Sequence, residues 1–171
     1  MDLKQVIVDI PDFPKPGILF RDITPVMEIP EAYAAALSGL AGLLEGLEFD
    51  SLAAIESRGF VLGGPLARDL GKAMVLVRKA GKLPRETVGE SYELEYGSAE
   101  VEVHRDSVQA GQKVVVIDDL LATGGTAAAA GRLVRKCGAE VVAYLFMVEL
   151  EGLAGRAQLT DAPVFSLVKY A

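Results

Sequence analysis

Two adjacent acids followed by a turn of small residues form the most chemically informative segment of the chain. A run of Val and Ile at 114–117 precedes Asp118 and Asp119. The turn that follows supplies small side chains, two hydroxyls and backbone N–H groups at the start of a predicted helix, which suits a phosphate monoester. The turn consists of Ala122, Thr123, Gly124, Gly125 and Thr126. Two carboxylates do not bind that phosphate favourably, and their natural partners are vicinal hydroxyls or a hydrated divalent cation. A phosphate at one end and a diol at the other describe a ribose 5-phosphate.

Other interpretations of this segment are helix capping and the known nucleotide-binding loops. An isolated pair of acids before a helix is as well explained by helix capping as by ligand binding. Here the pair follows a predicted buried strand, and ligands of open α/β sheets bind outside the carboxyl ends of the strands. The chain contains neither the Walker A sequence nor the dinucleotide fingerprint G-x-G-x-x-G. The pattern therefore favours a ligand site of another kind.

A stretch of basic residues could hold a second, strongly anionic group. Four basic residues and no acid lie between positions 78 and 85, in a chain that is acidic as a whole. Glycines and a proline interrupt residues 78–91, which lack apolar periodicity and are therefore predicted to be a loop. A solvated flexible loop is the simpler interpretation of such a charge run. Between two strands, the same residues also suit a lid that closes over an anion and excludes water.

Apolar runs alternate with helical patterns along the chain, and this alternation predicts the fold. Buried strands are predicted at 51–55, 73–77, 113–117, 141–148 and 164–168, helices at 31–47, 59–70, 124–137 and 152–159, and an antiparallel hairpin at 92–96 and 100–104. Strands separated by helices imply right-handed parallel crossovers. We expect an α/β fold with a central, mainly parallel sheet flanked by helices, in one domain over residues 1–171.

Composition limits the classes of protein to which the chain could belong. With 171 residues, of which 51% are hydrophobic and 24% charged, there is material for one packed domain. The net charge of −7 argues against a nucleic-acid-binding surface. The longest uncharged stretch, 32–44, is too short to span a membrane, and the N-terminal residues lack the pattern of an export signal. The single cysteine, Cys137, fits a reducing compartment, and we expect a cytoplasmic protein without membrane or nucleic-acid partners.

The segment with the two acids resembles the phosphoribosyl-diphosphate motif of the type I phosphoribosyltransferase family, in which two acids precede a T-G-G-T phosphate loop. Four further segments resemble, in order, the signatures of the adenine phosphoribosyltransferases in this family. They are F-P-x-P-G-x-x-F-R-D-I from Phe13, E-S-R-G-F from Glu56, R-K-x-G-K-L-P from Arg78 and Y-x-L-E-Y-G from Tyr92. The resemblance covers about residues 10 to 151. It implies a Rossmann-like sheet with a small N-terminal hood over about residues 1–30 and a flexible lid loop at 78–91.

The resemblance implies transfer of the 5-phosphoribosyl group from 5-phosphoribosyl 1-diphosphate to adenine, giving AMP and pyrophosphate in purine salvage. Asp118 and Asp119 then bind the ribose, and residues 122–126 bind its phosphate. Pyrophosphate binding is implied for Glu56, Ser57, Arg58, Arg78, Lys79 and Lys82. Mg²⁺ is the expected cofactor, held mainly by the substrate, with Asp118 or Asp119 contributing through water and no direct protein ligand assured. The family also implies a homodimer.

Adenine recognition and proton transfer are implied for a smaller set of residues. Phe20 stacks on the base, Leu120 covers its other face, and backbone groups of Leu19 and Arg21 bind its edge. Phe20 could equally be a core aromatic on the sequence alone. Glu95 is the expected proton carrier for the base, supported by Tyr96. Arg58 is the other expected catalytic residue, and it follows the strand predicted at 51–55, which places it at the same edge of the sheet as Asp118. The only histidine, His104, and Cys137 are expected to lie outside the site.

Two alternative functions remain open at this point. The first is a phosphoribosyltransferase for another base, such as xanthine, with the same phosphate site and a different hood. The second is a regulator that senses phosphoribosyl diphosphate without catalysis. A regulator is expected to add a DNA-binding domain or a basic face, or to lose the lid and acid residues. The chain has neither the length nor the charge for the additions, and it retains the lid motif.

Overall fold

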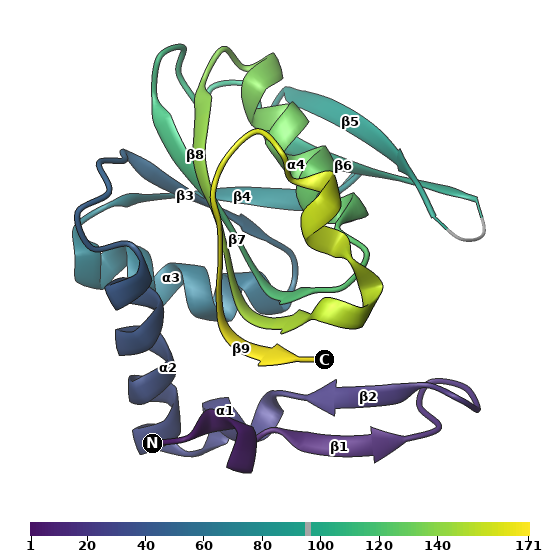
Figure 1. Ribbon diagram of the computed structural model, residues 1–171. Coiled ribbons are helices and arrows are strands. Elements are labelled where there is room, and N and C mark those ends of the chain that lie inside the picture. Colours follow the sequence, from purple (N-terminus) through teal and green to yellow (C-terminus); the bar gives the residue numbers. More distant parts are fainter. Residues whose placement is uncertain (95–96) are drawn as a thin grey trace.

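A seven-stranded sheet forms the centre of the protein in the computed structural model, which describes residues 1–94 and 97–171 (Figure 1). The strands are β3 (Ser51–Ile55), β4 (Ala73–Lys79), β5 (Thr87–Glu93), β6 (Ser98–His104), β7 (Lys113–Leu121), β8 (Glu140–Leu150) and β9 (Val164–Tyr170). Their order is β5-β6-β4-β3-β7-β8-β9. The five strands from β4 to β9 in this order run parallel, and the antiparallel hairpin β5–β6 joins the edge of β4.

Alternating side chains of the central strands build a core on each face of the sheet. On β8, Leu145 and Met147 belong to one apolar cluster, whereas Tyr144 and Phe146 belong to the other. Every residue of β3 is buried, as expected for a strand covered on both sides. The period-two alternation of apolar side chains on two covered faces explains why these segments form central strands.

Helices cover both faces of the sheet. The helices α2 (Pro30–Leu43) and α3 (Arg58–Leu70) pack into one cluster, and α4 (Gly125–Lys136) packs into the other. Gly71 ends α3 in the left-handed conformation, with φ 63°, which glycine adopts without strain. Arg135 and Lys136 in the last turn of α4 complement the negative end of the helix dipole.

The first 30 residues form a small separate layer. The strands β1 (Val8–Pro11) and β2 (Leu19–Asp22) pair as a two-stranded antiparallel sheet, which lies below the end of β9 in Figure 1. A 3-10 helix, Leu3–Gln5, precedes this hairpin, and α1 (Thr24–Glu28) connects it to α2. Leu3, Ile23 and Val26 join the same apolar cluster as α2 and α3, so this layer is packed on the body of the protein.

The expected α/β class and mainly parallel central sheet are confirmed. The expected range of the lid loop is wrong, because Arg78 and Lys79 belong to β4 and residues 87–91 to β5, which leaves 80–86 between these strands. The expected bounds of the first hairpin strand, 92–96, are also wrong, because β5 begins at Thr87. Residues 87–91 are mostly polar and lie on an edge strand, so they carry little apolar pattern in the sequence. The helix predicted at 152–159 is instead a pair of 3-10 turns, Glu151–Leu153 and Gly155–Gln158. Within residues 1–94 and 97–171, no helix is both long and apolar enough to cross a membrane.

The packing of α4 on β8 predicts opposite effects for two helical Gly-to-Ala substitutions. A Cβ on Gly131 would lie 2.0 Å from the hydroxyl of Tyr144, which donates hydrogen bonds to Asp161 and is therefore not free to move. We expect Gly131→Ala to lower the free energy of unfolding by about 1–3 kcal/mol through overpacking. Gly42→Ala, whose Cβ would meet no atom within 4 Å, should raise it by up to about 1 kcal/mol. Urea titrations of both variants measure the two effects, and a stabilised Gly131→Ala would contradict this packing.

Candidate active site

The candidate site lies where the chain leaves the sheet in two directions. The strand β3 sits between β4 and β7, so the connections after β3 and β7 lead to opposite faces of the sheet. Such a switch point opens a crevice outside the carboxyl ends of the strands, where ligands of α/β proteins bind. The turn Glu56-Ser57-Arg58 follows β3, and Asp118 and Asp119 lie in the last part of β7. The peptide bond between Glu56 and Ser57 is cis.

An ion pair joins the two strand ends. The Nε of Arg58 donates to Oδ2 of Asp119 over 2.6 Å, and the Asp119 side chain is 8% exposed. The sequence-based expectation that Arg58 lies at the same edge as the acids is therefore confirmed. The Asp119 backbone N–H donates to Oδ1 of Asp118 over 2.8 Å. Burial and the adjacent Asp119 carboxylate raise the pKa of Asp118 well above its ordinary value.

The turn after the acids forms a small pocket of about 90 Å³. Its walls are Asp118, Leu120, Leu121 and residues 122–127, so the structure brings all five predicted phosphate-loop residues together beside an acid. Gly124 caps α4 with φ 86°, a conformation that side chains rarely adopt. The loop therefore presents backbone groups and the Thr123 and Thr126 side chains at the N-terminus of a 12-residue helix. This arrangement is suited to a phosphate dianion.

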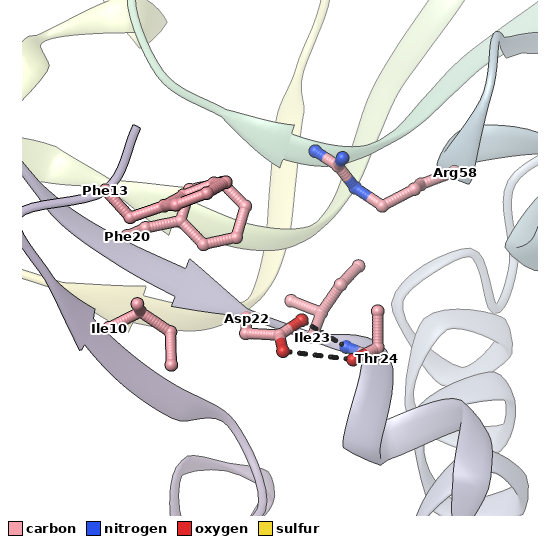
Figure 2. A pocket seen from close by; sticks show the side chains of 7 residues that line it. All are labelled: Ile10, Phe13, Phe20, Asp22, Ile23, Thr24 and Arg58. Atoms are coloured by element: carbon pink, nitrogen blue, oxygen red, sulfur yellow. Dashed lines mark hydrogen bonds between the residues drawn. The ribbon is translucent and has the colours of Figure 1, made fainter. Parts of the chain in front are cut away.

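A larger cavity of about 430 Å³ lies between the hairpin β1–β2 and α3 (Figure 2). Its lining residues are Ile10, Phe13, Phe20, Asp22, Ile23, Thr24 and Arg58. The Phe13 and Phe20 rings meet edge to face, with centroids 5.1 Å apart, and Figure 2 shows Arg58 reaching in from the opposite side. The Asp22 carboxylate accepts hydrogen bonds from the N–H and hydroxyl of Thr24, at 2.9 and 3.0 Å. An apolar cavity with a few polar groups is suited to a flat heteroaromatic ring.

Other predicted base contacts lie outside this cavity. Leu120 lines the phosphate-loop pocket instead. The Arg21 guanidinium pairs with Asp9 and stacks 4.1 Å over the ring of Tyr170, away from the cavity. In an antiparallel ladder, pairs of residues that exchange hydrogen bonds alternate with pairs that do not. Pro11 has no N–H, so the Pro11–Leu19 pair is of the second kind, and Asp9–Arg21, two residues along, is of the same kind. Backbone groups of Leu19 and Arg21 therefore face the edge of β2 that is not paired with β1.

The predicted pyrophosphate residues divide into anchored and exposed groups. The Glu56 carboxylate accepts hydrogen bonds from Nε of Arg78 at 2.9 Å and from the backbone N–H of Lys79 at 3.0 Å. Arg78 also donates to the carbonyl of Lys82 at 3.1 Å, so it joins the end of β3 to the loop after β4. The side chains of Ser57, Lys79 and Lys82 are exposed. Glu56 thus orients a cation near the site.

Two predicted catalytic and supporting residues, Glu95 and Tyr96, lie outside the described residues. The structure adds others that the sequence reasoning missed. Phe13, Asp22 and Thr24 line the cavity, although all that marked them was their place in or beside the F-P-x-P-G-x-x-F-R-D-I segment. Tyr92 lies within hydrogen-bond distance of Thr126, with 3.3 Å between their hydroxyl oxygens.

Comparison with known proteins shows which proteins this chain resembles. A family model described as "Phosphoribosyl transferase domain" matches residues 27–164. The adenine phosphoribosyltransferase of Synechococcus sp. is 52% identical over 170 residues, which cover 99% of each chain.

Solved structures agree. The crystal structure of adenine phosphoribosyltransferase from Thermoanaerobacter pseudethanolicus superposes with a TM-score of 0.96 at 50% identity, covering 99% of this chain and 98% of that one. The Saccharomyces cerevisiae adenine phosphoribosyltransferase, complexed with an imino-altritol bisphosphate and adenine, gives a TM-score of 0.92 at 41% identity, covering 97% and 96%. Sequence and backbone geometry thus point to the same group of proteins.

The raised pKa of Asp118 predicts a stabilising substitution. In the folded state, ionisation of this carboxyl is disfavoured, so its contribution to stability is present at acid pH and is lost as the pH rises through the folded-state pKa. We expect Asp118→Asn to have a higher free energy of unfolding than the wild type at pH 7. The difference should shrink as the pH falls toward about 3.9, the ordinary pKa of aspartate.

Denaturant titrations at several pH values measure this difference. Asp69→Asn provides the control, because Asp69 is half exposed and pairs with Arg68 at the surface. An Asp118→Asn variant less stable than the wild type at pH 7 would contradict the assignment.

Proposed function

The chain belongs to the adenine phosphoribosyltransferases, and from that membership we propose how its residues transfer the 5-phosphoribosyl group of 5-phosphoribosyl 1-diphosphate to adenine. The products are AMP and pyrophosphate, and the enzyme is a glycosyltransferase of purine salvage. The observation that carries the proposal is the Arg58–Asp119 contact. Arg58 lines the apolar cavity, and Asp119 lies between Asp118 and Leu120, which line the phosphate-loop pocket. A ribose bound beside this ion pair would therefore reach from the base to the phosphate.

The ribose phosphate binds at residues 122–126, and the ribose hydroxyls donate to Asp118 and Asp119. The loop offers neutral donors at a helix N-terminus, which stabilise a phosphate without requiring a lysine. A raised pKa at Asp118 matches a carboxyl that is shielded from water and is stabilised when a ligand donates to it.

Adenine occupies the cavity of Figure 2. Phe20 stacks on one face of the ring, with Phe13 edge-on behind it. We assign the other face to Leu120, which covers the base from the phosphate-loop pocket that it lines. The unpaired edge of β2 offers the backbone N–H and C=O groups of Leu19 and Arg21 to the edge of the base. Recognition by backbone groups gives specificity without a diagnostic side chain.

Charge that develops on the leaving pyrophosphate is stabilised by fixed cations. Arg58 is the first of these, and Arg78, Lys79 and Lys82 are the others, with Ser57 as a hydroxyl donor. Glu56 contributes to the pyrophosphate site by holding Arg78 and the backbone of Lys79 in place. The loop 80–86 acts as the lid, which excludes water from the oxocarbenium-like centre.

A magnesium ion fits this arrangement as a partner of the substrate. Mg²⁺ prefers oxygen ligands and keeps several waters, so it is commonly held by one or two carboxylates together with substrate phosphates. Asp118 or Asp119 would contribute such a carboxylate through water, with the ion held mainly by the substrate. No cluster of three or more potential ligands occurs in the part of the chain that the structure describes. When bound, the ion would neutralise charge on the diphosphate.

The base nitrogen is the nucleophile. As N9 forms its bond to the anomeric carbon, the bond from that carbon to the diphosphate oxygen breaks, and the diphosphate leaves with the electron pair. The ring must also lose a proton, and we assign its transfer to Glu95, supported by Tyr96. Because N9 attacks directly, no covalent enzyme intermediate is needed.

The remaining assignments concern the whole chain. Residues 1–171 act as one domain, and the protein works in the cytoplasm as a homodimer. The exposed apolar side chains of Val61 and Leu76, at 40% and 39% exposure, suit a subunit contact.

A panel of bases tests the proposed reaction. Adenine, hypoxanthine, guanine, xanthine and orotate are each incubated with 5-phosphoribosyl 1-diphosphate and Mg²⁺, and pyrophosphate release is followed. We expect adenine to be the preferred base, with loss of activity in EDTA, and a light-scattering mass of two chains. Turnover of hypoxanthine but not of adenine would contradict the proposal that adenine is the substrate. No turnover at all would favour a sensor.

Single-turnover kinetics test the role of Glu95. Glu95→Gln keeps the size of the side chain but removes the proton acceptor, so the chemical step should slow by about 10²–10⁴-fold, the usual contribution of general acid–base catalysis. Glu93→Gln, an exposed residue at the end of β5, is the matched control and should keep the wild-type rate. If Glu95→Gln retained that rate too, the acid–base role would fail.

A further inference from the structure

We propose that Gly155 and Arg156, together with Glu149, are positioning residues that hold the phosphate loop in its binding shape from outside. None of the three belongs to the phosphoribosyl-diphosphate motif, and all lie at or beyond the end of β8. The inference rests on the proposed phosphate role of residues 122–126. It assigns a task to the connection between β8 and β9, which the proposed reaction leaves without one.

The backbone of Gly155 lies directly against the backbone of the phosphate loop. A Cβ built on Gly155 would lie 2.2 Å from the carbonyl oxygen of Ala122 and 3.0 Å from the nitrogen of Gly124. Conversely, a Cβ built on Gly124 would lie 2.4 Å from the carbonyl oxygen of Gly155. Both glycines are buried, so this is a contact between two main chains with no room for a side chain.

Arg156 fixes the position of that contact. Its Nε and Nη2 donate to the two carboxylate oxygens of Glu149 at 2.9 and 2.6 Å, and its Nη1 donates to the carbonyl of Val164 at 2.6 Å. The guanidinium therefore ties the end of β8 to the start of β9, one residue after Gly155. Planar, two-point pairing of this kind sets geometry as well as charge.

Strand pairing between β8 and β7 connects the Arg156–Glu149 ion pair to the phosphate loop. It is paired in register with Leu121, the residue that precedes Ala122, and its side chain is 5% exposed. The hydrogen bonds from Arg156 lower the pKa of the Glu149 carboxyl, so it is ionised at neutral pH. The buried charge has Arg156 as its partner, and this gives the connection one preferred conformation.

Backbone conformation adds to this constraint. Ala154 adopts φ 52°, in the left-handed region that non-glycine residues seldom occupy. Such a residue persists when its surroundings over-determine it. Here the surroundings are the Arg156 hydrogen bonds on one side and the glycine contact on the other. The N–H groups of residues 122–126 are thereby aimed before a phosphate arrives, and pre-organised donors bind more tightly than donors that must be ordered on binding.

Gly155→Ala tests the contact, with Gly152→Ala as the matched control in the same connection. A Cβ on Gly152 would have its nearest neighbour at 3.9 Å, an ordinary contact. Calorimetry with AMP measures the phosphate site directly, and steady-state assays give KM for each substrate. For Gly155→Ala we expect AMP binding to weaken at least about tenfold, since the loss of a single hydrogen bond to a charged group weakens binding by about this factor or more. KM for 5-phosphoribosyl 1-diphosphate should rise similarly, and KM for adenine should stay within about threefold of the wild type, as a change confined to the phosphate loop predicts.

The outcomes separate the inference from the proposed function. If the wild-type chain does not bind AMP, the proposed function fails. If the wild type, Gly152→Ala and Gly155→Ala all bind AMP alike, the positioning role fails. A Gly155→Ala variant with lower kcat, unchanged KM values and unchanged AMP affinity would show a merely structural role.

Arg156→Lys decides the question should Gly155→Ala lose its cooperative unfolding transition. Lysine keeps the positive charge but lacks the planar fork that binds Glu149 and Val164 together. We expect AMP affinity to fall about three- to tenfold, with a smaller effect than that of the glycine substitution. Unchanged AMP affinity in Arg156→Lys would overturn the proposal.

Discussion

Two adjacent carboxylates at the end of a buried strand require a cation beside them, and the rest of the site depends on how that cation is supplied. Arg58 meets Asp119 at 2.6 Å because β3 and β7 pair in parallel register, with Ala54 opposite Ile117. Gly59 favours the close start of α3 against β7, since a Cβ there would lie 3.0 Å from Oδ1 of Asp118 and 3.2 Å from the carbonyl oxygen of Ile117, both tight contacts. The Arg58–Asp119 ion pair thus depends on the order of the strands, on the close start of α3 and on the position of the two carboxylates. In the proposed reaction, the same guanidinium serves both the ribose site and the departing anion.

The N-terminal hood is held on the sheet through the Arg21 side chain, whose direction follows from the alternation of side chains along β2. Phe20 and Arg21 are neighbours on β2, so their side chains point to opposite faces of the hairpin. Phe20 lines the cavity, whereas Arg21 pairs with Asp9 and stacks on Tyr170 of β9. The face opposite the cavity therefore docks the hood onto the last strand. Arg21 acts as an anchor through its side chain, and in the proposed complex only its backbone contacts the base.

Features with a local cause in the sequence are predictable, whereas features that arise from contacts between distant segments are not. Buried strands and the small-residue turn at 122–126 are predictable, because Val and Ile runs and clustered small residues are local signals, and β3 has the bounds expected from the sequence. The start of β5 was missed because an edge strand with polar residues has little apolar pattern. The Arg58–Asp119 pair was foreseen only as a shared edge, since its 61-residue separation makes it a product of strand order. Gly155 carried no signal at all, because a lone glycine acquires meaning only when another backbone approaches it.

The acidic composition acquires a different meaning once its partners are known. The chain has 24 acidic and 17 basic residues, which by itself argues against anionic ligands. Yet several acids hold cations in place: Glu56 orients Arg78, Asp119 receives Arg58, and Glu149 fixes Arg156. Arginine side chains lose conformational freedom when they bind an anion, and a carboxylate partner restricts that freedom in advance. The excess of acids is therefore compatible with anion binding, because what a phosphate meets is the local field of the positioned cations and helix dipole rather than the net charge.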